Sequence, residues 1–267
     1  MTSLKAAQPQ SSGKHLHQYL RLVFLACVTL LASAIATAQD YVEWSTETRT
    51  SLGFRVNSAA IESLLPDGWS LTPIPDAPGK VNISVTFMDR HLVLDAQGEK
   101  VRTGTSRYMV MSVQARHESN GQSGTMIVNG ISPEGAGAYE VYQPAVVASA
   151  ERTSSGQGEE FGVTEETWEL AAESGDSVTL HLHYRKAMPV RRQSSVVIRS
   201  GHRPEFTRTY QIDQASDVLG IPGAPDSRIE QLSFTVAGPL FSRIFDGTEV
   251  ITGVTSIPMY TREIFIP

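Results

Sequence analysis

The amino-acid sequence predicts a β-dominated α+β fold, and two observations support this prediction. Apolar and polar residues alternate from Val81 to Met88, so that Ile83, Val85 and Phe87 would lie on one face of a strand. Short segments rich in Thr, Val and aromatic residues recur along the chain between turn residues, whereas few segments favour a helix. A sheet of many strands usually curls or closes to protect its edges. We therefore expect a large sheet that curls or closes, accompanied by few and short helices.

One short helix is expected among the strands of the first half. Residues 41–56 suit one or two strands. Ser58 can cap a helix, which Pro66-Asp67-Gly68 would end. Three strands are expected to follow, at 81–95, 107–116 and 125–131. An Asn-Gly pair predicts a tight hairpin between the last two of them.

The second half is expected to consist almost entirely of strands. Residues 239–245 could form a short amphipathic helix that ends before Gly247. The tail at 250–266 is β-like, with breaks expected at Gly253 and Pro258. The remaining strands are expected at 146–152, 166–171, 177–187, 194–200, 206–212 and 228–236.

The first 38 residues have the pattern of a secretory signal peptide. Lys5, Lys14 and Arg21 come before an apolar run at 22–36, and small residues then lead to Ala38. The apolar run is shorter than the roughly 20 residues of a membrane span. We therefore expect cleavage after Ala38, a periplasmic or secreted protein, and no stable membrane span after cleavage.

The single cysteine, Cys27, lies inside this leader. Cleavage after Ala38 would leave a chain without a thiol or a disulfide. Processing as a lipoprotein at Cys27 is the alternative, which the residues before it match poorly. No internal repeat or long linker divides residues 39–267, so we expect one domain there.

Charge and motifs exclude several classes of partner. The leader contains three basic residues and no acid, which leaves residues 39–267 with 19 Lys and Arg against 28 Asp and Glu, a formal charge of −9. Nucleic acids and anionic membrane surfaces need a basic footprint, so neither is expected as a partner. The sequence has no P-loop, dinucleotide fingerprint or H-E-x-x-H helix, and no cofactor is expected.

Two histidines form the most specific local pattern. His181 and His183 lie two residues apart in an expected strand, so both imidazoles and Arg185 would share one face. Such a pair can bind a transition metal if further ligands converge on it, or can serve as acid–base groups. An outward polar face is the simpler interpretation, because the other histidines stand at no diagnostic spacing: His91, His117 and His202.

Arginines gather in the same part of an otherwise acidic chain. Alternate members of this group could face a pocket and bind a carboxylate through two hydrogen bonds each. A solvated face with salt bridges is the simpler interpretation. The group comprises Arg185, Arg191, Arg192, Arg199, Arg203 and Arg208.

Two segments together resemble the acetoacetate decarboxylase-like family. The segment FRVNSAAIESLLPDGWSL at 54–71 resembles the strand, short helix and Leu-Leu-Pro near the start of these proteins. The segment GAYEVYQPAVVA at 137–148 keeps the spacing of the family from Gly137 to Pro144. The resemblance implies a cone-like closed antiparallel β-barrel with a few short flanking helices, an enclosed pocket and a homo-oligomer. It also implies the chemistry of the true decarboxylases, in which the first of two lysines after the Pro forms a Schiff base with a β-keto acid.

The resemblance fails at that chemistry. The two lysine positions are Ala145 and Val146 here, and neither side chain can form an imine. We expect both to give the pocket wall an apolar surface beside Pro144. Tyr139 and Tyr142 are expected in the same wall.

Other residues are candidates for binding or catalysis. The family has a pocket arginine near the N-terminus, for which Arg49 and Arg55 are the candidates. Lys186 could replace the missing imine lysine, and Glu140 could move a proton. No metal site is predicted.

Three functions remain open from the sequence. The first is binding, or acting on, a small keto or carboxylate compound without the Schiff-base mechanism of the family. The second is a lyase or decarboxylase that uses Lys186 or acid–base groups instead. The third is a lipocalin-like carrier of a hydrophobic ligand. The lining of the pocket distinguishes them, because carboxylates need Arg or His and carriers need apolar walls.

Overall fold

A computed structural model describes residues 39–73 and 80–267. The predicted signal peptide, including its cleavage site and Cys27, lies outside the described residues, as do residues 74–79. The unit Asp40–Pro267 contains all the described strands and helices. Within the described ranges, no helix is long and apolar enough to cross a membrane.

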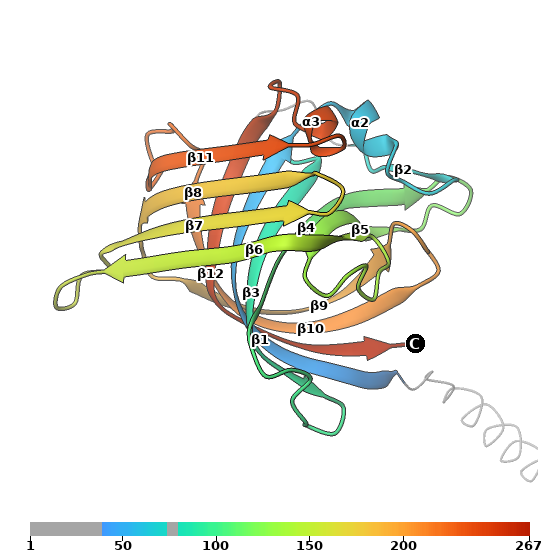
Figure 1. Ribbon diagram of the computed structural model, residues 1–267, viewed down its shortest axis with the longest axis horizontal. Helices are drawn as coiled ribbons and strands as arrows, with labels where there is room; N and C mark the ends of the chain where they lie inside the picture. The colour runs from blue at the N-terminus through green and yellow to red at the C-terminus, as the bar shows by residue number, and fades with distance from the viewer. Residues whose placement is uncertain (1–38, 74–79) are drawn as a thin grey trace, which may run out of the picture. The chain divides into compact units, whose positions relative to one another are not determined.

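The unit is dominated by strands, as the sequence predicts (Figure 1). Two short helices, α2 (Ser58–Glu62) and α3 (Phe241–Ile244), interrupt them. The strands of the first half are β1 (Asp40–Arg55), β2 (Trp69–Leu71), β3 (Ile83–Asp95), β4 (Ser106–His117) and β5 (Ser123–Ser132). Those of the second half are β6 (Tyr142–Ser155), β7 (Val163–Ala172), β8 (Ser177–Arg185), β9 (Val190–Ser200), β10 (Thr207–Gly220), β11 (Ile229–Ala237) and β12 (Val250–Ile266).

The expected breaks in the C-terminal tail are wrong. Strand β12 runs through both Gly253 and Pro258. Gly253 pairs with Gly53 of β1, and Pro258 lies where the register of β12 against β1 shifts. A proline is tolerated at such an irregularity because its missing N–H interrupts no regular ladder bond.

Seven of the described strands pair in a continuous circuit. Its order is β5, β9, β10, β12, β1, β3 and β4, and β4 pairs again with β5. All neighbours in the circuit are antiparallel except β5 and β9, which pair in parallel through Thr125–Ile127 and Ile198–Ser200. The expectation of a purely antiparallel sheet is therefore wrong at this point.

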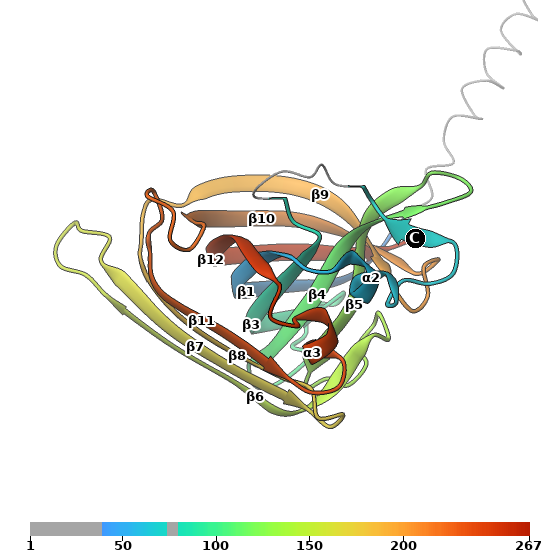
Figure 2. The same cartoon turned by 90° about the horizontal axis from the view of Figure 1, so that it is seen from above.

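Strand β5 is also the branch point for a second layer. After the three residues that pair with β9, the same edge of β5 pairs with the first residues of β6, Tyr142–Pro144. Strand β6 then continues with β7, β8 and β11, which together form a four-stranded layer (Figure 2). We call these four strands the outer sheet.

The alternation of side chains gives each circuit strand two different faces. Along β3, Ile83, Val85 and Phe87 pack into the main apolar core, whereas Met88 and Arg90 point to the opposite face. The same division holds in β1, β4 and β5. One face of the circuit is thus apolar and covered, and the other lines a cavity.

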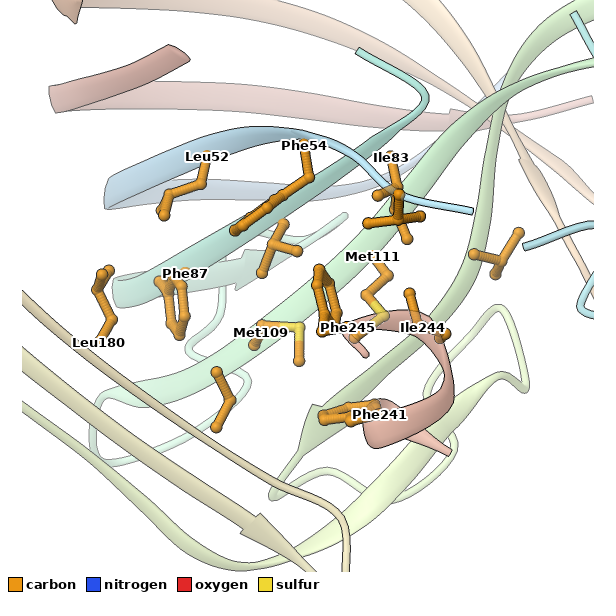
Figure 3. Packing of buried hydrophobic residues seen from close by; sticks show 14 of the residues in the cluster. Leu52, Phe54, Ile83, Phe87, Met109, Met111, Leu180, Phe241, Ile244 and Phe245 are labelled. Carbon is orange, nitrogen blue, oxygen red and sulfur yellow. The ribbon is translucent and has the colours of Figure 1, made fainter. Parts of the chain in front are cut away.

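The main core lies between the circuit and the outer sheet (Figure 3). Phe87 of β3 meets Trp168 of β7 with ring centroids 5.5 Å apart. Phe54 contacts Phe234 of β11 and Phe245, which follows α3. Burying each such side chain stabilises the fold by about 1.5–3 kcal/mol. This packing fixes the position of β1, β3 and β4, whose other faces form the site.

Candidate functional site

A cavity of about 240 Å³ lies on the other face of the circuit. Every strand of the circuit contributes to its lining, together with the loop between β5 and β6. Its charged lining residues are Glu43, Arg49, Arg90, Glu134, Arg208 and Arg262. Four tyrosines line it as well: Tyr108, Tyr139, Tyr142 and Tyr210.

Glu47 of β1 is buried beneath this lining, with 1% of its surface exposed. Arg49 donates from Nε to Glu47 Oε2 at 2.7 Å, and Ser45 donates to Oε1 at 2.9 Å. Arg262 Nη2 and Arg90 Nε lie 3.2 and 3.4 Å from Oε1. Burial alone would raise the pKa of Glu47, but the three guanidinium groups outweigh it and lower that pKa to about 2. The carboxylate therefore stays charged at neutral pH.

The charges of this buried cluster do not cancel. Its second acid, Glu43, binds Arg90 and lies 3.9 Å from Arg262 Nη2. Glu134 also lies 3.8 Å from Arg90 Nη1 and pairs with Arg102. Counted together, four arginines face three glutamates, which leaves one positive charge over. Arg49 Nη2 lies 2.6 Å from Glu47, yet no described acceptor has hydrogen-bond geometry to it. Proximity alone does not use an N–H donor, so this donor remains unused.

Aromatic rings hold two of these arginines in place. The Arg49 guanidinium lies 3.4 Å from the ring centroid of Tyr260, and that of Arg262 lies 4.8 Å from the ring of Tyr210. Stacking of this kind stabilises a buried guanidinium while leaving its edge N–H groups available.

Two tyrosine hydroxyls meet in the cavity wall. Tyr139 donates to the Tyr210 hydroxyl at 2.8 Å. A phenol has one proton, so Tyr210 keeps its own proton to donate, and the described residues supply no acceptor for it. Burial raises the pKa of Tyr139 well above its usual value, and the neighbouring Tyr210 adds to this effect. Tyr139 is therefore protonated at neutral pH.

Two glycines position the Tyr142 ring. A Cβ atom at Gly137 would lie 2.6 Å from Tyr142 Cδ2, and one at Gly130 would lie 2.7 Å from Cδ1. Gly137 also has a φ of 63°, which favours glycine. The spacing from Gly137 to Pro144 therefore has a local cause, because it places a tyrosine between two glycines. Burial raises the pKa of Tyr142 well above its usual value, so its hydroxyl is a donor.

Arg208 of β10 lines the cavity near the Tyr139 ring. Its Cζ lies 6.0 Å from the Tyr139 centroid and 5.9 Å from that of Phe206. Its Nε is buried, and none of the described residues forms a hydrogen bond or ion pair with this guanidinium.

Of the residues expected from the sequence, the cavity brings together Arg49, Tyr139 and Tyr142. From the arginine group at 185–208, Arg208 lines the cavity and the other five do not. Arg55 instead lines a separate hollow beside α2, with Ser58. Its side chain therefore lies outside the cavity, although it stands on the same strand as Arg49.

Pro144 and the two residues at the lysine positions, Ala145 and Val146, do not line the cavity. Pro144 pairs with Ser132 at the branch point. Ala145 packs against the main core, and Val146 is 63% exposed. The reason is topological, because β6 leaves β5 at Pro144 and carries the next residues into the outer sheet. The expected apolar contribution of Ala145 and Val146 to the cavity is therefore absent.

The described lysines lie elsewhere too. Lys80 and Lys100 are exposed. Lys186 lines a different hollow, with Tyr184 and Asp217.

The remaining candidates are on the surface. Glu140 has a φ of 57° and forms an ion pair of 2.8 Å with Arg203. His181 and His183 lie on the uncovered face of the outer sheet, where His183 Nδ1 is 3.2 Å from Glu230 Oε2. Among residues 39–73 and 80–267, no group of three His, Cys, Asp or Glu side chains is placed to hold a metal ion.

Sequence reasoning missed most of the cavity. It did not single out Glu47, Arg90, Arg262 or Tyr210. One signal was present, because Glu43, Ser45, Glu47 and Arg49 occupy alternate positions of one strand. Four polar residues on one strand face also describe an ordinary solvent-facing strand, so the pattern alone could not assign them to a cavity.

Comparisons with known proteins agree on the fold. No family model matches the sequence, and no curated protein matches it. The enduracididine biosynthesis enzyme MppR complexed with pyruvate is similar in structure, with a TM-score of 0.51 at 10% identity over 88% of this chain and 91% of that one. An acetoacetate decarboxylase-like enzyme from Sphingomonas wittichii RW1 has a TM-score of 0.50 at 8% identity over 85% and 92%. MppR complexed with the condensation product of pyruvate and imidazole 4-carboxaldehyde has a TM-score of 0.50 at 10% identity over 88% and 90%.

These likenesses define the class of protein by its architecture. The chain has the acetoacetate decarboxylase-like fold, as the resemblance at 54–71 and 137–148 predicts. At 8–10% identity the likeness concerns the fold, and the chemistry has to be argued from the cavity itself.

Proposed function

We propose that this protein binds, or acts on, a small organic acid that carries keto and carboxylate groups. The observation that carries the proposal is the surplus of cations and hydrogen-bond donors in the cavity lining. The buried cluster has one more arginine than glutamate, and Arg208 has no acidic partner among the described residues. A keto acid offers only acceptors and a negative charge, which complements this lining.

The geometry suggests how such a ligand would lie. A carboxylate would bind at Arg49 and Arg262, two cluster arginines that line the cavity together with Tyr210. A carbonyl oxygen would accept the free proton of Tyr210, and Tyr139 would reinforce this donor by donating to its oxygen. MppR, which shares the fold, is known in complex with pyruvate, a compound of this class.

An imine mechanism is not part of the proposal. Lys80, Lys100 and Lys186 all lie outside the cavity, and Ala145 and Val146 stand where the lysines would be. If the protein is a lyase, the Tyr210 hydroxyl would stabilise the enolate that forms when a β-keto acid loses carbon dioxide. A carrier of hydrophobic ligands is disfavoured, because burying a fatty chain against four arginines would desolvate charges without compensation.

We also propose the finer features of the fold and compartment. The return pairing of β4 with β5 supports a closed, cone-like barrel around the cavity. The signal-peptide pattern of residues 1–38 supports export to the periplasm or the medium. N-terminal sequencing of exported protein should begin at Gln39, and retention of residues 1–38 would contradict export through cleavage. A homo-oligomer is proposed from the fold alone and is checked by light scattering.

Calorimetry with pyruvate and acetoacetate tests the binding proposal. We expect saturable binding of at least one acid to the wild-type protein. Tyr210→Phe should weaken it about two- to tenfold, because it removes one hydrogen bond of about 0.5–1.5 kcal/mol. Tyr41→Phe, at an exposed tyrosine outside the cavity, is the matched control and should leave binding unchanged. The proposal is overturned if the wild-type protein binds none of pyruvate, acetoacetate, 2-oxopentanoate and 2-oxoglutarate, or if both variants weaken binding equally.

Borohydride treatment in the presence of acetoacetate tests the exclusion of an imine. We expect no reduced adduct on any lysine. A stoichiometric adduct at Lys80, Lys100 or Lys186 would show that the chemistry lies outside the cavity.

A further inference from the structure

Arg208 brings an unbalanced positive charge to the cavity. Its guanidinium has no described hydrogen-bond or ion-pair partner, and its Nε is buried. Its contacts are with the faces of two aromatic rings, those of Tyr139 and Phe206. An aromatic face attracts a cation but accepts no conventional hydrogen bond, so the N–H donors of Arg208 remain unused.

The acids of the loop between β5 and β6 are already paired. Glu134 of the cavity lining binds Arg102 and accepts from Ser106. Glu140, next to Tyr139 in sequence, pairs with Arg203 at 2.8 Å. The charge of Arg208 is therefore available to a ligand.

Arg208 and the buried arginine cluster are linked through the tyrosine pair. Arg262 stacks on Tyr210, Tyr210 accepts from Tyr139, and the Tyr139 ring contacts Arg208. The strand register agrees with this order. Arg262 pairs with Ile212, which is four residues beyond Arg208 on β10, or about 13 Å along an extended strand. The cavity therefore has a cation towards each end and hydroxyl donors between them.

We propose that Arg208 forms a second anion-binding subsite, which makes the ligand a dicarboxylic keto acid. One carboxylate would bind at Arg49 and Arg262, the carbonyl at Tyr210, and the second carboxylate at Arg208. This inference rests on the proposed function, because it names the substrate class of the same cavity. It adds a specificity-determining residue that the keto-acid proposal alone does not need.

Two probes that differ only at the far end test the subsite. 2-Oxoglutarate and 2-oxopentanoate have the same five carbons, but only the first carries a second carboxylate. Calorimetry on the exported protein should show that 2-oxoglutarate binds at least about tenfold more tightly. Arg208→Gln should weaken binding of 2-oxoglutarate about ten- to a hundredfold, the usual effect of losing a charged hydrogen bond, and leave 2-oxopentanoate within threefold.

Arg192→Gln is the matched control, because Arg192 lies on the neighbouring strand β9, is exposed and does not line the cavity. It should change neither affinity, and Arg208→Lys should keep most of the preference for the dicarboxylate. Circular dichroism and melting temperature establish that each variant is folded.

The outcomes separate the two proposals. Equal affinity of the wild-type protein for both probes overturns the second subsite and leaves the proposed function standing. Equal loss of both probes in Arg208→Gln shows a structural role for Arg208 and also overturns the subsite. Failure of the wild-type protein to bind pyruvate, acetoacetate, 2-oxopentanoate or 2-oxoglutarate overturns the proposed function, and the subsite with it.

Discussion

At the scale of single residues, Glu47 compensates the positive charge of the buried arginines. It is the acid that Arg49, Arg90 and Arg262 all approach, and it is shielded from solvent. Buried ion pairs often contribute little net stability, but removing one partner leaves the others charged and desolvated. The stability of the cavity wall therefore depends on a residue that does not itself line the cavity.

Glu47→Gln is accordingly expected to destabilise the protein by about 3–5 kcal/mol, because among the described residues it leaves Arg49 without an acid and Arg262 with Glu43 alone, 3.9 Å away. Urea unfolding measures the change. Glu263→Gln, at an exposed glutamate of β12, should stay within about 0.5 kcal/mol. Equal small effects of the two substitutions would contradict the central role of Glu47.

The same residue predicts a dependence of stability on pH. Its pKa in the folded protein is about 2, against a usual value of 4.5. A lowered pKa of an acid stabilises the folded state above the unfolded pKa, and this contribution is lost as the pH falls towards the folded pKa. The contribution is on the order of 3 kcal/mol. We expect the free energy of unfolding of the wild-type protein to approach that of Glu47→Gln between pH 4.5 and pH 2, and a constant difference across that range would contradict the assignment.

At the scale of elements, the loop between β5 and β6 owes its shape to a ring that glycines accommodate. Gly135 and Gly137 both have positive φ angles, of 67° and 63°. Only at Gly137 would an added Cβ meet the Tyr142 ring, since nothing lies within 4 Å of the corresponding position at Gly135. An alanine at Gly135 would therefore add backbone strain alone, whereas an alanine at Gly137 would add both backbone strain and a collision with the Tyr142 ring.

Gly137→Ala should therefore destabilise the protein more than Gly135→Ala. Both substitutions place alanine at a positive φ, which costs about 1–2 kcal/mol, and Gly137→Ala additionally displaces Tyr142. Urea unfolding gives the difference, and affinity for a keto acid should fall only in Gly137→Ala. Identical behaviour of the two variants would show that the ring contact is unimportant.

At the scale of the whole molecule, the shape of the cavity depends on an apolar core that lies on the other face of the same strands. The outer sheet packs on one face of the circuit, and the cavity occupies the other. Leu180→Ala, at a fully buried position of β8, should cost about 2–5 kcal/mol. Val146→Ala, at an exposed position of the same sheet, should change stability by less than about 0.5 kcal/mol, as measured by urea unfolding. Comparable losses in both variants would contradict the packing of the outer sheet on the circuit.

Much of this architecture could be predicted from the sequence. The alternation at 81–88 and the turn residues between segments indicated the strands, because a strand with one covered face repeats every two residues. The segments at 54–71 and 137–148 indicated the fold, and they also led to Arg49, Tyr139 and Tyr142.

The rest of the site could not be predicted, for a physical reason. A cavity lined by charged and phenolic side chains has the same period of two as a face in solvent, so Glu47, Arg90 and Arg262 looked like ordinary surface residues. Only the pairing of distant strands, such as β1 with β12, brings these residues together. The departure of β6 at Pro144 was equally invisible, and it took Ala145 and Val146 out of the cavity.

The placement of Tyr142 between Gly130 and Gly137 has a consequence for redesign. The Tyr142 ring occupies space that a side chain at Gly137 or Gly130 would enter. Tyr142→Ala would enlarge the cavity and remove the ring from beside Gly130. It would also give Gly137 room for a side chain, subject to its positive φ. The destabilisation caused by a substitution at Gly137 should therefore be smaller in a Tyr142→Ala background. Gly130, Gly137 and Tyr142 are thus the natural positions at which to begin reshaping the cavity for bulkier acids.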